Sequence, residues 1–571
     1  MKRLVSTFGT LLIVAVAAGG GVLTAHADAT TDCAGLATAL SGATDGDVIT
    51  LDDDHLCPGA FTIPTGVNIT LQGQDQGDGF DGQGTNQSLR GTDNGATVIR
   101  HLTFTNASGG ALWLSGDVAP TLDAAIFLSN SGGGADFSAT SGDVTVSNST
   151  FGGVGQGNTS FEGAGLMAFG PHVLVTNNTF LHNHVTATSG GFSGGAVAVG
   201  GFAADDHAVV FRSNTVVGNT SDGASGAGAH LQGRGTVTIT DNSFRDNSIA
   251  ASNTGNRANR GGGLSTRTYG SDQFSRVFQA RNRFENNVIH TLTFVADDGN
   301  QPEDFGGAGE FAGGPALVSV DDTFVNNHVD AGAGGNTAVG GGLAYTAESE
   351  TDRGFFSASN LVAAHNGVGA GGEGGGIYVG FGVGCRQEPC PSQMDLFDST
   401  VTSNTVGADG EGREIAGDED DIAHVTNSIV TGAAGSGTDI EGFGTLTVTR
   451  SDTCVAGAAA TGSGNICANP LLAGVATNDV HQTASSPSRD KGDTAVVPAG
   501  LDNDYEGDTR VLEAAVDMGA DEFSPEPPTL PAAGQPGESA ATAEAVLALG
   551  VVCVALLGGF MARSWRRTQA R

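Results

Sequence analysis

Three segments, each 40 residues after the one before, decide the fold: Phe244-Arg245-Asp246-Asn247, Phe284-Glu285-Asn286-Asn287 and Phe324-Val325-Asn326-Asn327. In each of them an asparagine follows a phenylalanine by three positions. The same spacing, with Phe or Val as its first residue, recurs on both sides of these segments and ends at Asn130, Asn183, Asn219 and Asn404. Self-similarity at a period of about 20–50 residues indicates a solenoid, a propeller or an array of repeats.

A second motif alternates with the first: a glycine cluster that runs into an aliphatic residue, as in Gly109-Gly110-Ala111-Leu112 and Gly340-Gly341-Gly342-Leu343. Short alternating runs such as Val237-Thr238-Ile239-Thr240 are typical of strands with one buried face. If each unit is one coil, the coils stack as parallel strands about 4.8 Å apart. Phenylalanines then form an internal column, and asparagines form a ladder like those of other in-register stacks. The sequence therefore predicts an all-β parallel β-helix over residues 73–468, with a ladder of Asn130, Asn183, Asn219, Asn247, Asn287, Asn327 and Asn404. The alternative is a glycine-rich disordered surface protein.

These paired motifs resemble those of the polymorphic outer-membrane proteins and of right-handed parallel β-helix surface proteins in general. The resemblance covers residues 103–430 and implies a right-handed β-helix without implying an activity, because one fold hosts many functions. Residues 33–51, which end in Gly46-Asp47-Val48-Ile49-Thr50-Leu51, resemble the N-terminal cap of exported β-helix proteins. Asp32 is expected to cap a short amphipathic helix there. Residues 28–72 are thus expected to form the cap and the first coil.

The N-terminus predicts export. Lys2-Arg3, the apolar run from Leu11 to Val16 and the Ala25-His26-Ala27 sequence have the layout of a secretory signal peptide over residues 1–27, cleaved after Ala27. The alternative is a membrane helix that is retained. Six cysteines lie in near pairs, which predicts three local disulfides in an exported chain: Cys33 with Cys57, Cys385 with Cys390, and Cys454 with Cys467.

The C-terminal part has three segments. Residues 469–523 resemble the C-terminal module of bacterial exported β-helix proteins, through Ser485-Ser486-Pro487-Ser488-Arg489-Asp490-Lys491-Gly492, and are expected to close the end of the solenoid. Residues 524–544 form a proline-rich linker. Residues 545–571 are an apolar run followed by arginines, at the lower length limit for a membrane span, with the arginines on the cytoplasmic side.

The linker and tail together resemble a sortase sorting signal, with the motif Leu530-Pro531-Ala532-Ala533-Gly534. Ala533 stands where threonine is usual, at the residue where sortase forms its acyl intermediate. Two outcomes follow: covalent attachment to peptidoglycan with removal of the tail, or a retained single-span membrane anchor. Both place residues 28–523 at the cell surface.

Composition restricts the partners. The chain has 62 acidic and 24 basic residues, a net charge of −38, so its surface repels nucleic acid and anionic membranes. Six arginines gather within about one coil, where they either hold an anionic sugar or neutralise acidic neighbours: Arg257, Arg260, Arg267, Arg276, Arg281 and Arg283. Alternate acidic residues have the spacing of a calcium loop: Asp502, Asp504, Glu506 and Asp508. No organic cofactor is indicated.

The sequence carries no catalytic constellation that we can assign, and neither Walker A nor H-E-x-x-H occurs. It favours an exported, surface-anchored β-helix with an adhesive or structural role, bound to a surface glycan or protein. The alternative is a carbohydrate-active enzyme, a polysaccharide lyase or a glycoside hydrolase, on the same scaffold. Acidic residues and an arginine that converge in one groove would favour the enzyme.

Overall fold

The computed structural model describes residues 28–524 except residues 54, 188–193, 224, 254–259, 270–274, 295–304, 331–337, 348–353, 382–390, 433–437 and 455–459. Two units are distinguished, Met1–Phe523 and Ser524–Arg571. The expected signal peptide with Ala27, the motif Leu530–Gly534, the apolar tail and the Cys385–Cys390 pair lie outside the described residues. Within the described ranges, no helix has the length and apolar character needed to cross a membrane.

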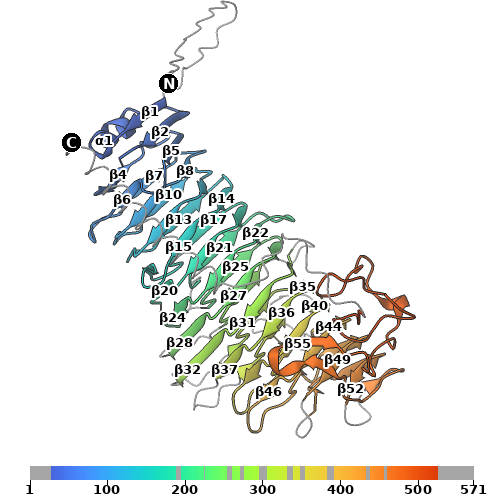
Figure 1. Ribbon diagram of the computed structural model, residues 1–571. Helices are drawn as coiled ribbons and strands as arrows, with labels where there is room; N and C mark the ends of the chain where they lie inside the picture. The colour runs from blue at the N-terminus through green and yellow to red at the C-terminus, as the bar shows by residue number, and fades with distance from the viewer. Residues whose placement is uncertain are drawn as a thin grey trace, which may run out of the picture. The chain divides into compact units, whose positions relative to one another are not determined.

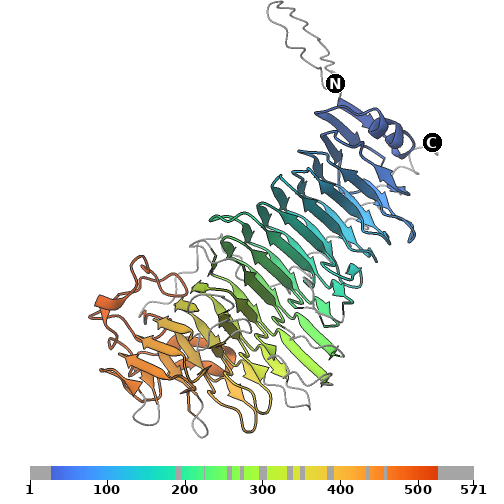
Figure 2. The same ribbon diagram turned by 180° about the vertical axis from the view of Figure 1, so that it is seen from behind.

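The first unit is a parallel β-helix, as the sequence predicts. Three long sheets have 16, 14 and 13 strands, and a fourth sheet has eight, with neighbouring strands one coil apart in sequence. The 16-stranded sheet runs from β1 (Asp28–Thr31) to β53 (Ala460–Thr461), and the 14-stranded sheet from β3 (Leu56–Pro58) to β52 (Asp452–Thr453). The 13-stranded sheet runs from β4 (Phe61–Thr62) to β50 (Ile440–Glu441), and the eight-stranded sheet from β16 (Thr159–Ser160) to β46 (Thr405–Val406). Figures 1 and 2 show the coils stacked in one direction.

Phenylalanine rings form a column inside the coils. Residues 40 apart pair in register, Phe244 with Phe284 and Phe284 with Phe324, on β27 (Ser243–Arg245), β31 (Arg283–Glu285) and β36 (Thr323–Val325). Their ring centroids lie 4.9 and 4.6 Å apart, and the rings are almost parallel. Each ring is fully buried. The column forms because the backbone spacing of adjacent strands brings equivalent side chains into van der Waals contact.

One rung of the column contains a valine, and a neighbouring sheet compensates for it. Val216, on β23 (Thr215–Val217), pairs with Phe180 on one side and Phe244 on the other. Phe211, on β22 (Val209–Arg212) of the 16-stranded sheet, lies with its centroid 6.4 Å from that of Phe180 and 6.0 Å from that of Phe244. The interior therefore stays filled although the repeat is interrupted.

An asparagine ladder runs along one buried corner. Asn247 donates from its Nδ2 to Asn287 Oδ1 at 3.0 Å and to the Val216 carbonyl at 3.0 Å. The Asn287 Oδ1 also accepts the backbone amide of Asn247. The same bonds continue through Asn130, Asn158, Asn183, Asn219, Asn247, Asn287, Asn327, Asn366 and Asn404. Each rung thus satisfies polar groups that would be costly to bury unpaired.

A second asparagine ladder, which the sequence analysis missed, occupies another corner. Asn178, Asn214, Asn242 and Asn282 repeat the same bonds, and the last donates to Asp322 Oδ1 at 3.0 Å. These residues lie five positions before members of the first ladder. The signal in the sequence is an asparagine two positions before the Phe or Val of the motif, as in Asn178-Thr179-Phe180 and Asn282-Arg283-Phe284.

The glycine clusters form the entry to the 13-stranded sheet. Gly261, which precedes β29 (Leu264–Thr268), has φ of +67°, and a Cβ there would lie 1.9 Å from the Leu264 carbonyl oxygen. Gly340, before β39 (Leu343–Ala347), has φ of +58° and the same kind of close approach. Any larger residue would collide with backbone, which explains why the corner repeats glycine.

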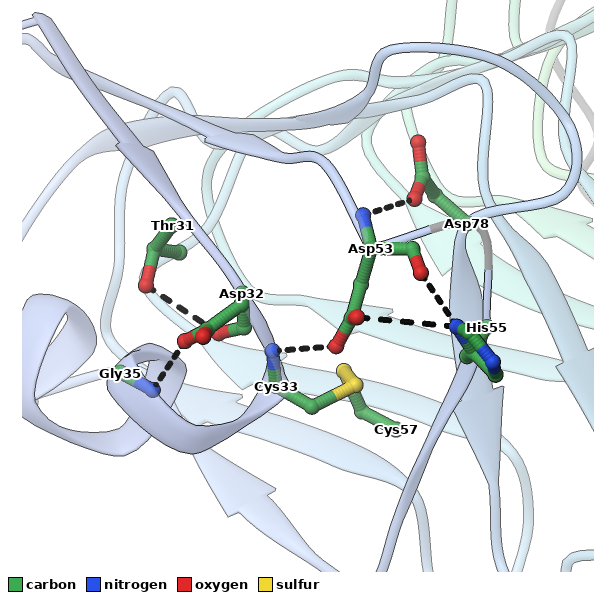
Figure 3. The surroundings of a disulfide bond; sticks show 8 residues. All are labelled: Thr31, Asp32, Cys33, Gly35, Asp53, His55, Cys57 and Asp78. Atoms are coloured by element: carbon green, nitrogen blue, oxygen red, sulfur yellow. Dashed lines mark hydrogen bonds and ion pairs between the residues drawn. A yellow bond between two sulfur atoms is a disulfide. The ribbon is translucent and has the colours of Figure 1, made fainter. Parts of the chain in front are cut away.

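The N-terminal end carries helix α1 (Cys33–Ser41), whose side chains Leu36 and Leu40 are buried. Asp32 caps the helix by accepting the Gly35 amide. A disulfide joins Cys33 to Cys57 on β3, and Asp53 accepts the Cys33 amide beside it (Figure 3). A second disulfide joins Cys454 and Cys467.

The C-terminal module, residues 469–523, lies against the side of the solenoid. Ala520 and Val480 pack on Val325 and Val362 of the 14-stranded sheet, and the Ala520 amide donates to Thr400 Oγ1 at 2.9 Å. Strand β55 (Asp479–Gln482) is drawn beside this sheet in Figure 1. The module also reaches the last strand of this sheet, since Ser488 Oγ donates to Asp452 Oδ2 at 2.7 Å. That it closes the end of the solenoid stays a prediction.

Candidate functional site

The outward face of the 13-stranded sheet carries a continuous row of unlike side chains. Adjacent strands β7 (Leu89–Thr92), β10 (Leu112–Gly116), β13 (Ala135–Ala139) and β17 (Leu166–Gly170) place Arg90, Trp113, Asp136 and Met167 in register. Their neighbours along each strand, such as Leu112 and Leu114, are fully buried in the core. The row therefore points away from the core, and its members lie one strand spacing apart.

A hollow with a volume of about 60 Å³ lies on this part of the face. Trp113, Asp136, Met167 and Glu162 line it, together with the glycine corner 132–134. Gly109 also lines it, and a Cβ at Gly109 would have only Gln87 as a neighbour, at 3.6 Å. The hollow combines an aromatic side chain with a few convergent polar groups, as ligand sites do, but it is far smaller than the roughly 300–1,000 Å³ of a pocket that encloses a small molecule, so it would hold only part of a ligand.

Asp136 is the unusual group of the hollow. Its Oδ1 is buried and has no hydrogen-bond partner among the described residues. Burial raises the pKa of Asp136 from 3.8 to about 7. The carboxyl group is thus partly protonated at neutral pH, and it can donate a hydrogen bond to a ligand oxygen or accept one from a ligand hydroxyl. A ligand that supplied this bond would remove the cost of the unpaired oxygen.

Farther along the same row is a group of polar residues on β25 (Ala229–Gly233) and β29. His230 is 8% exposed, and burial followed by the charges of Arg267 and Arg260 lowers its pKa to about 4, so the imidazole is neutral. Tyr269 donates to Gln232 Oε1 at 3.1 Å, and Arg267 lies over the Tyr269 ring at 4.8 Å. His230 could not be identified from the sequence, because only the strand register reveals that it shares a face with Arg267.

The arginines of the predicted cluster lie in two environments: some pair with acidic side chains, and others lie on the outward face of the 13-stranded sheet. Arg281 pairs with Asp241 at 2.7 Å, Arg283 with Glu285 at 3.0 Å and Arg276 with Asp206 at 3.8 Å, so these three neutralise acidic neighbours. Arg260 instead lies over the Phe311 ring at 4.5 Å, on the outward face of the 13-stranded sheet. Arg257 lies outside the described residues.

The four candidate calcium ligands are not arranged around one point. Asp504 Oδ1 accepts the amides of Glu506, Gly507 and Asp508, and its Oδ2 accepts the amide of Glu522. Its oxygens therefore hold the loop together. In the described part of the chain, Glu506 belongs to a group with His481 and Asp521, and neither Asp502 nor Asp508 belongs to any group with ligand geometry.

A second group with ligand geometry consists of Cys33, Asp53 and Cys57. Its two sulfurs form the disulfide drawn in Figure 3 and are not thiolates, so they do not bind a metal ion. Asp53 instead holds the segment: its carboxylate accepts the Cys33 amide at 2.7 Å, and its own amide donates to Asp78 at 2.9 Å.

Comparison with known proteins agrees with the fold. The family model described as "Right handed beta helix region" matches residues 88–263, which include Trp113, Asp136, Met167 and His230 and end before Arg267 and Tyr269. No curated protein matches the chain. Among solved structures, a PL6-family alginate lyase, AlyGC, is similar at 11% sequence identity, covering 77% of this chain and 100% of that chain, with a TM-score of 0.16. A similarity at that level carries no argument about this chain.

The sheets and the family match together define the class: the chain is a right-handed parallel β-helix protein. Its particular features are a repeat built on buried asparagine ladders, local disulfides and a hollow on the outward face of the 13-stranded sheet.

Proposed function

We propose that this protein is an exported, surface-anchored β-helix that binds a neutral glycan strand along the outward face of its 13-stranded sheet, in an adhesive role. The observation that carries the proposal is the hollow in which Trp113 and Asp136 are adjacent in register. An indole gives an apolar surface for the ring of a sugar, and a carboxyl group with an unpaired oxygen gives a partner for its hydroxyls.

The charge of the chain favours a neutral glycan over an acidic one. A net charge of −38 repels polyanions at long range, and Asp136 and Glu162 would face an anionic ligand directly. The accessible part of the row spans four adjacent strands, with Arg90, Trp113, Asp136 and Met167, because the next members, Ala198 and His230, are buried. A linear polymer that runs across these strands, along the solenoid axis, would meet successive side chains. This arrangement suits a chain of sugars better than a single small molecule.

The test uses Trp113 as its own reporter. The chain has two tryptophans, and the other is Trp565, so a Trp565→Phe background leaves Trp113 as the sole indole. Titration with neutral hexasaccharides should change its fluorescence, and Gly109→Val, which fills the hollow without a positive φ, should weaken binding at least tenfold. Phe202→Ala removes an aromatic side chain that is 43% exposed elsewhere and should not alter binding.

A result against the proposal is equally clear. If no neutral glycan changes the Trp113 signal, or if Gly109→Val binds as well as the parent, the hollow is not a glycan site. If acidic glycans bind and neutral ones do not, the adhesive proposal stands with a different ligand class and the charge argument fails.

Export and anchoring are part of the same proposal. We infer cleavage after Ala27 and attachment through Leu530–Gly534 or the apolar tail 545–571. The two disulfides support an oxidising compartment, where such bonds persist. N-terminal sequencing of the mature protein should begin at Asp28. Release of the chain by a peptidoglycan hydrolase would indicate wall attachment, whereas release only by detergent would indicate a membrane anchor.

The alternative is a carbohydrate-active enzyme. Asp136, with its raised pKa, and Glu162 line one hollow, which resembles the acid and second carboxylate of a glycoside hydrolase. His230, Arg267 and Tyr269 could serve a polysaccharide lyase as base and charge-stabilising groups. New reducing ends that vanish in Asp136→Asn would favour the hydrolase. Unsaturated uronate absorbance that vanishes in His230→Ala would favour the lyase.

A further inference from the structure

A histidine and two carboxylates from three separate segments converge in the C-terminal module. His481 lies on β55, Glu506 lies in the loop 502–508, and Asp521 lies in the segment 517–522. One ligand atom from each lies within 4.8 Å of the other two. The group is on the module that covers the 14-stranded sheet, and the glycan proposal does not use it.

The imidazole is oriented for coordination. Asp479 hydrogen-bonds to His481 Nδ1, and Nε2 is directed at Glu506. Metal-bound histidines almost always hydrogen-bond through the ring nitrogen that does not touch the metal, most often to a carboxylate or a carbonyl. Asp479 thus occupies the position of a supporting carboxylate, and Nε2 is the ligand atom.

Both carboxylates sit on backbone that is already fixed. The loop that carries Glu506 is closed by Asp504, whose Oδ1 accepts three consecutive amides. Asp521 accepts the Gln482 amide at 2.6 Å through one oxygen, and the Gln482 side chain donates to the backbone carbonyls of Met518 and Asp521. Little rearrangement is needed to bring the three ligand atoms onto one ion.

The negative charge around this group favours binding of a cation. Asp521 is 4% exposed, and it is buried beside Glu506 and Asp504. Three carboxylates, those of Asp479, Glu506 and Asp521, surround the imidazole of His481. Of the two carboxylate ligands Asp521 is buried and Glu506 is exposed. An imidazolium supplies at most one positive charge, whereas a divalent ion would compensate both carboxylates.

We propose that His481, Glu506 and Asp521 bind a divalent transition-metal ion, for which Zn²⁺ is the probe, and that Asp479 is a positioning residue for His481. One imidazole and two carboxylates are a ligand set that Zn²⁺ accepts, with water as the fourth ligand. Calcium is coordinated by six to eight oxygen ligands, and an imidazole nitrogen is not among its preferred ligands. The ion would add a coordinate link among three segments that also meet through the apolar contacts of Val480, Tyr505 and Ala520.

A structural consequence follows from the neighbours of the group. Tyr505 and Val480, adjacent in sequence to Glu506 and His481, belong to the apolar cluster that includes Val325 and Val362 of the 14-stranded sheet. Metal binding would therefore hold the module against the sheet, and it should raise the temperature at which this module detaches.

The test is calorimetric titration of the chelator-treated full-length protein with ZnCl₂ and, separately, with CaCl₂. One Zn²⁺ should bind per chain and raise the thermal transition. His481→Ala and Glu506→Gln should each weaken Zn²⁺ binding at least tenfold, and Asp479→Asn should weaken it by about 10–100-fold. Glu506→Gln preserves the shape of the side chain, so it remains informative if His481→Ala misfolds.

His172→Ala is the matched control. His172 also lies between two carboxylates, Asp143 and Asp205, each 2.7 Å from a different ring nitrogen, so the three do not share one point. Zn²⁺ affinity should be unchanged in this variant. The proposal fails if chelator-treated protein binds no Zn²⁺, if calcium binds more tightly than Zn²⁺, or if the His481 and Glu506 variants bind Zn²⁺ as tightly as the parent.

Discussion

Asn404 ends the first asparagine ladder by donating to the carboxyl group of Glu414, from its Nδ2 at 2.5 Å and from its backbone amide at 3.3 Å. Glu414 is fully buried, and burial raises its pKa to about 8. The second ladder ends in the same way, at Asp322, whose pKa burial raises to about 7. In both, a side chain with two acceptor oxygens takes the place of the next asparagine.

Replacing Glu414 by glutamine should preserve the stability of the fold, whereas replacing it by alanine should reduce it. Glu414→Gln retains an acceptor for Asn404 and should leave stability at pH 6 nearly unchanged. Glu414→Ala removes the acceptor and should cost about 1–3 kcal/mol of unfolding free energy, because the buried Asn404 donor is left unpaired. Urea denaturation at pH 6 measures both, with the exposed Glu419→Gln as control. Equal effects of the two Glu414 variants would contradict the acceptor role.

Glu310 should make the fold sensitive to alkaline pH. It is fully buried on β34 (Glu310–Gly313), in a column where its in-register neighbours are Leu264 and Leu343. Burial raises its pKa from 4.5 to about 8. The folded state therefore holds a proton that the unfolded chain releases, so the Glu310 contribution is present below pH 4.5 and is lost as pH rises through about 8.

Glu310→Leu, which completes the leucine column, should consequently raise the unfolding free energy, and the gain should be larger at pH 9 than at pH 5. Urea midpoints at the two pH values measure it, and Glu419→Leu on the surface controls for the loss of a charge. A gain that is the same at both pH values would show that the pKa of Glu310 is not raised in the folded state.

Replacing Val216 by phenylalanine, the usual residue at this position of the repeat, should destabilise the fold. Phe211 already fills the space between Phe180 and Phe244, so Val216→Phe should overpack the core and cost about 1–3 kcal/mol. Phe211→Val should leave a cavity and also destabilise. The double variant exchanges the two side chains and should recover much of the loss, which a double-mutant cycle measures. Additive losses would show that the two sites do not share the space.

Asp136 should couple ligand binding to pH. Its pKa near 7 means that the neutral form, present below this pH, donates a hydrogen bond that the ionised form does not. Glycan affinity should fall as pH rises from 6 to 8, and Asp136→Asn should remove this dependence. The raised pKa of Asp136 makes the native state of the parent less stable as pH rises through about 7. The change in unfolding free energy caused by Asp136→Asn should therefore be more favourable at pH 8 than at pH 4. Trp113 fluorescence gives the affinity, and an unchanged pH profile in Asp136→Asn would contradict this role.

The Cys33–Cys57 disulfide should stabilise the N-terminal coil. The bond joins residues 24 apart and connects α1 to β3. Replacing both cysteines by serine should cost about 3 kcal/mol by the loop-entropy model. Hydrogen exchange should then increase in residues 28–72 more than in the Phe244–Phe324 coils, since each coil contacts only its neighbours. Uniform acceleration along the chain would show instead that the solenoid unfolds as one unit.

The sequence alone determined the architecture, because the repeat is local. A Phe or Val followed three positions later by Asn encodes the same strand and corner in most coils, and a glycine cluster encodes the turn into the 13-stranded sheet. Asn158 escaped detection because it follows Phe151 by seven positions, through an extra turn that changes the spacing and keeps the ladder. The helix α1 was also visible from Asp32 and the apolar spacing behind it.

Tertiary structure alone decided which chemistry-bearing residues meet. Trp113, Asp136 and Met167 come from three coils of different length, so their common face follows from register and not from any motif. His481, Glu506 and Asp521 are joined by loops whose paths depend on packing against the side of the sheet. The physical reason is the same in both cases: strand and corner preferences are encoded by neighbours in sequence, whereas side chains from separate coils or loops are brought together only when the coils stack and their loops find a surface to cover.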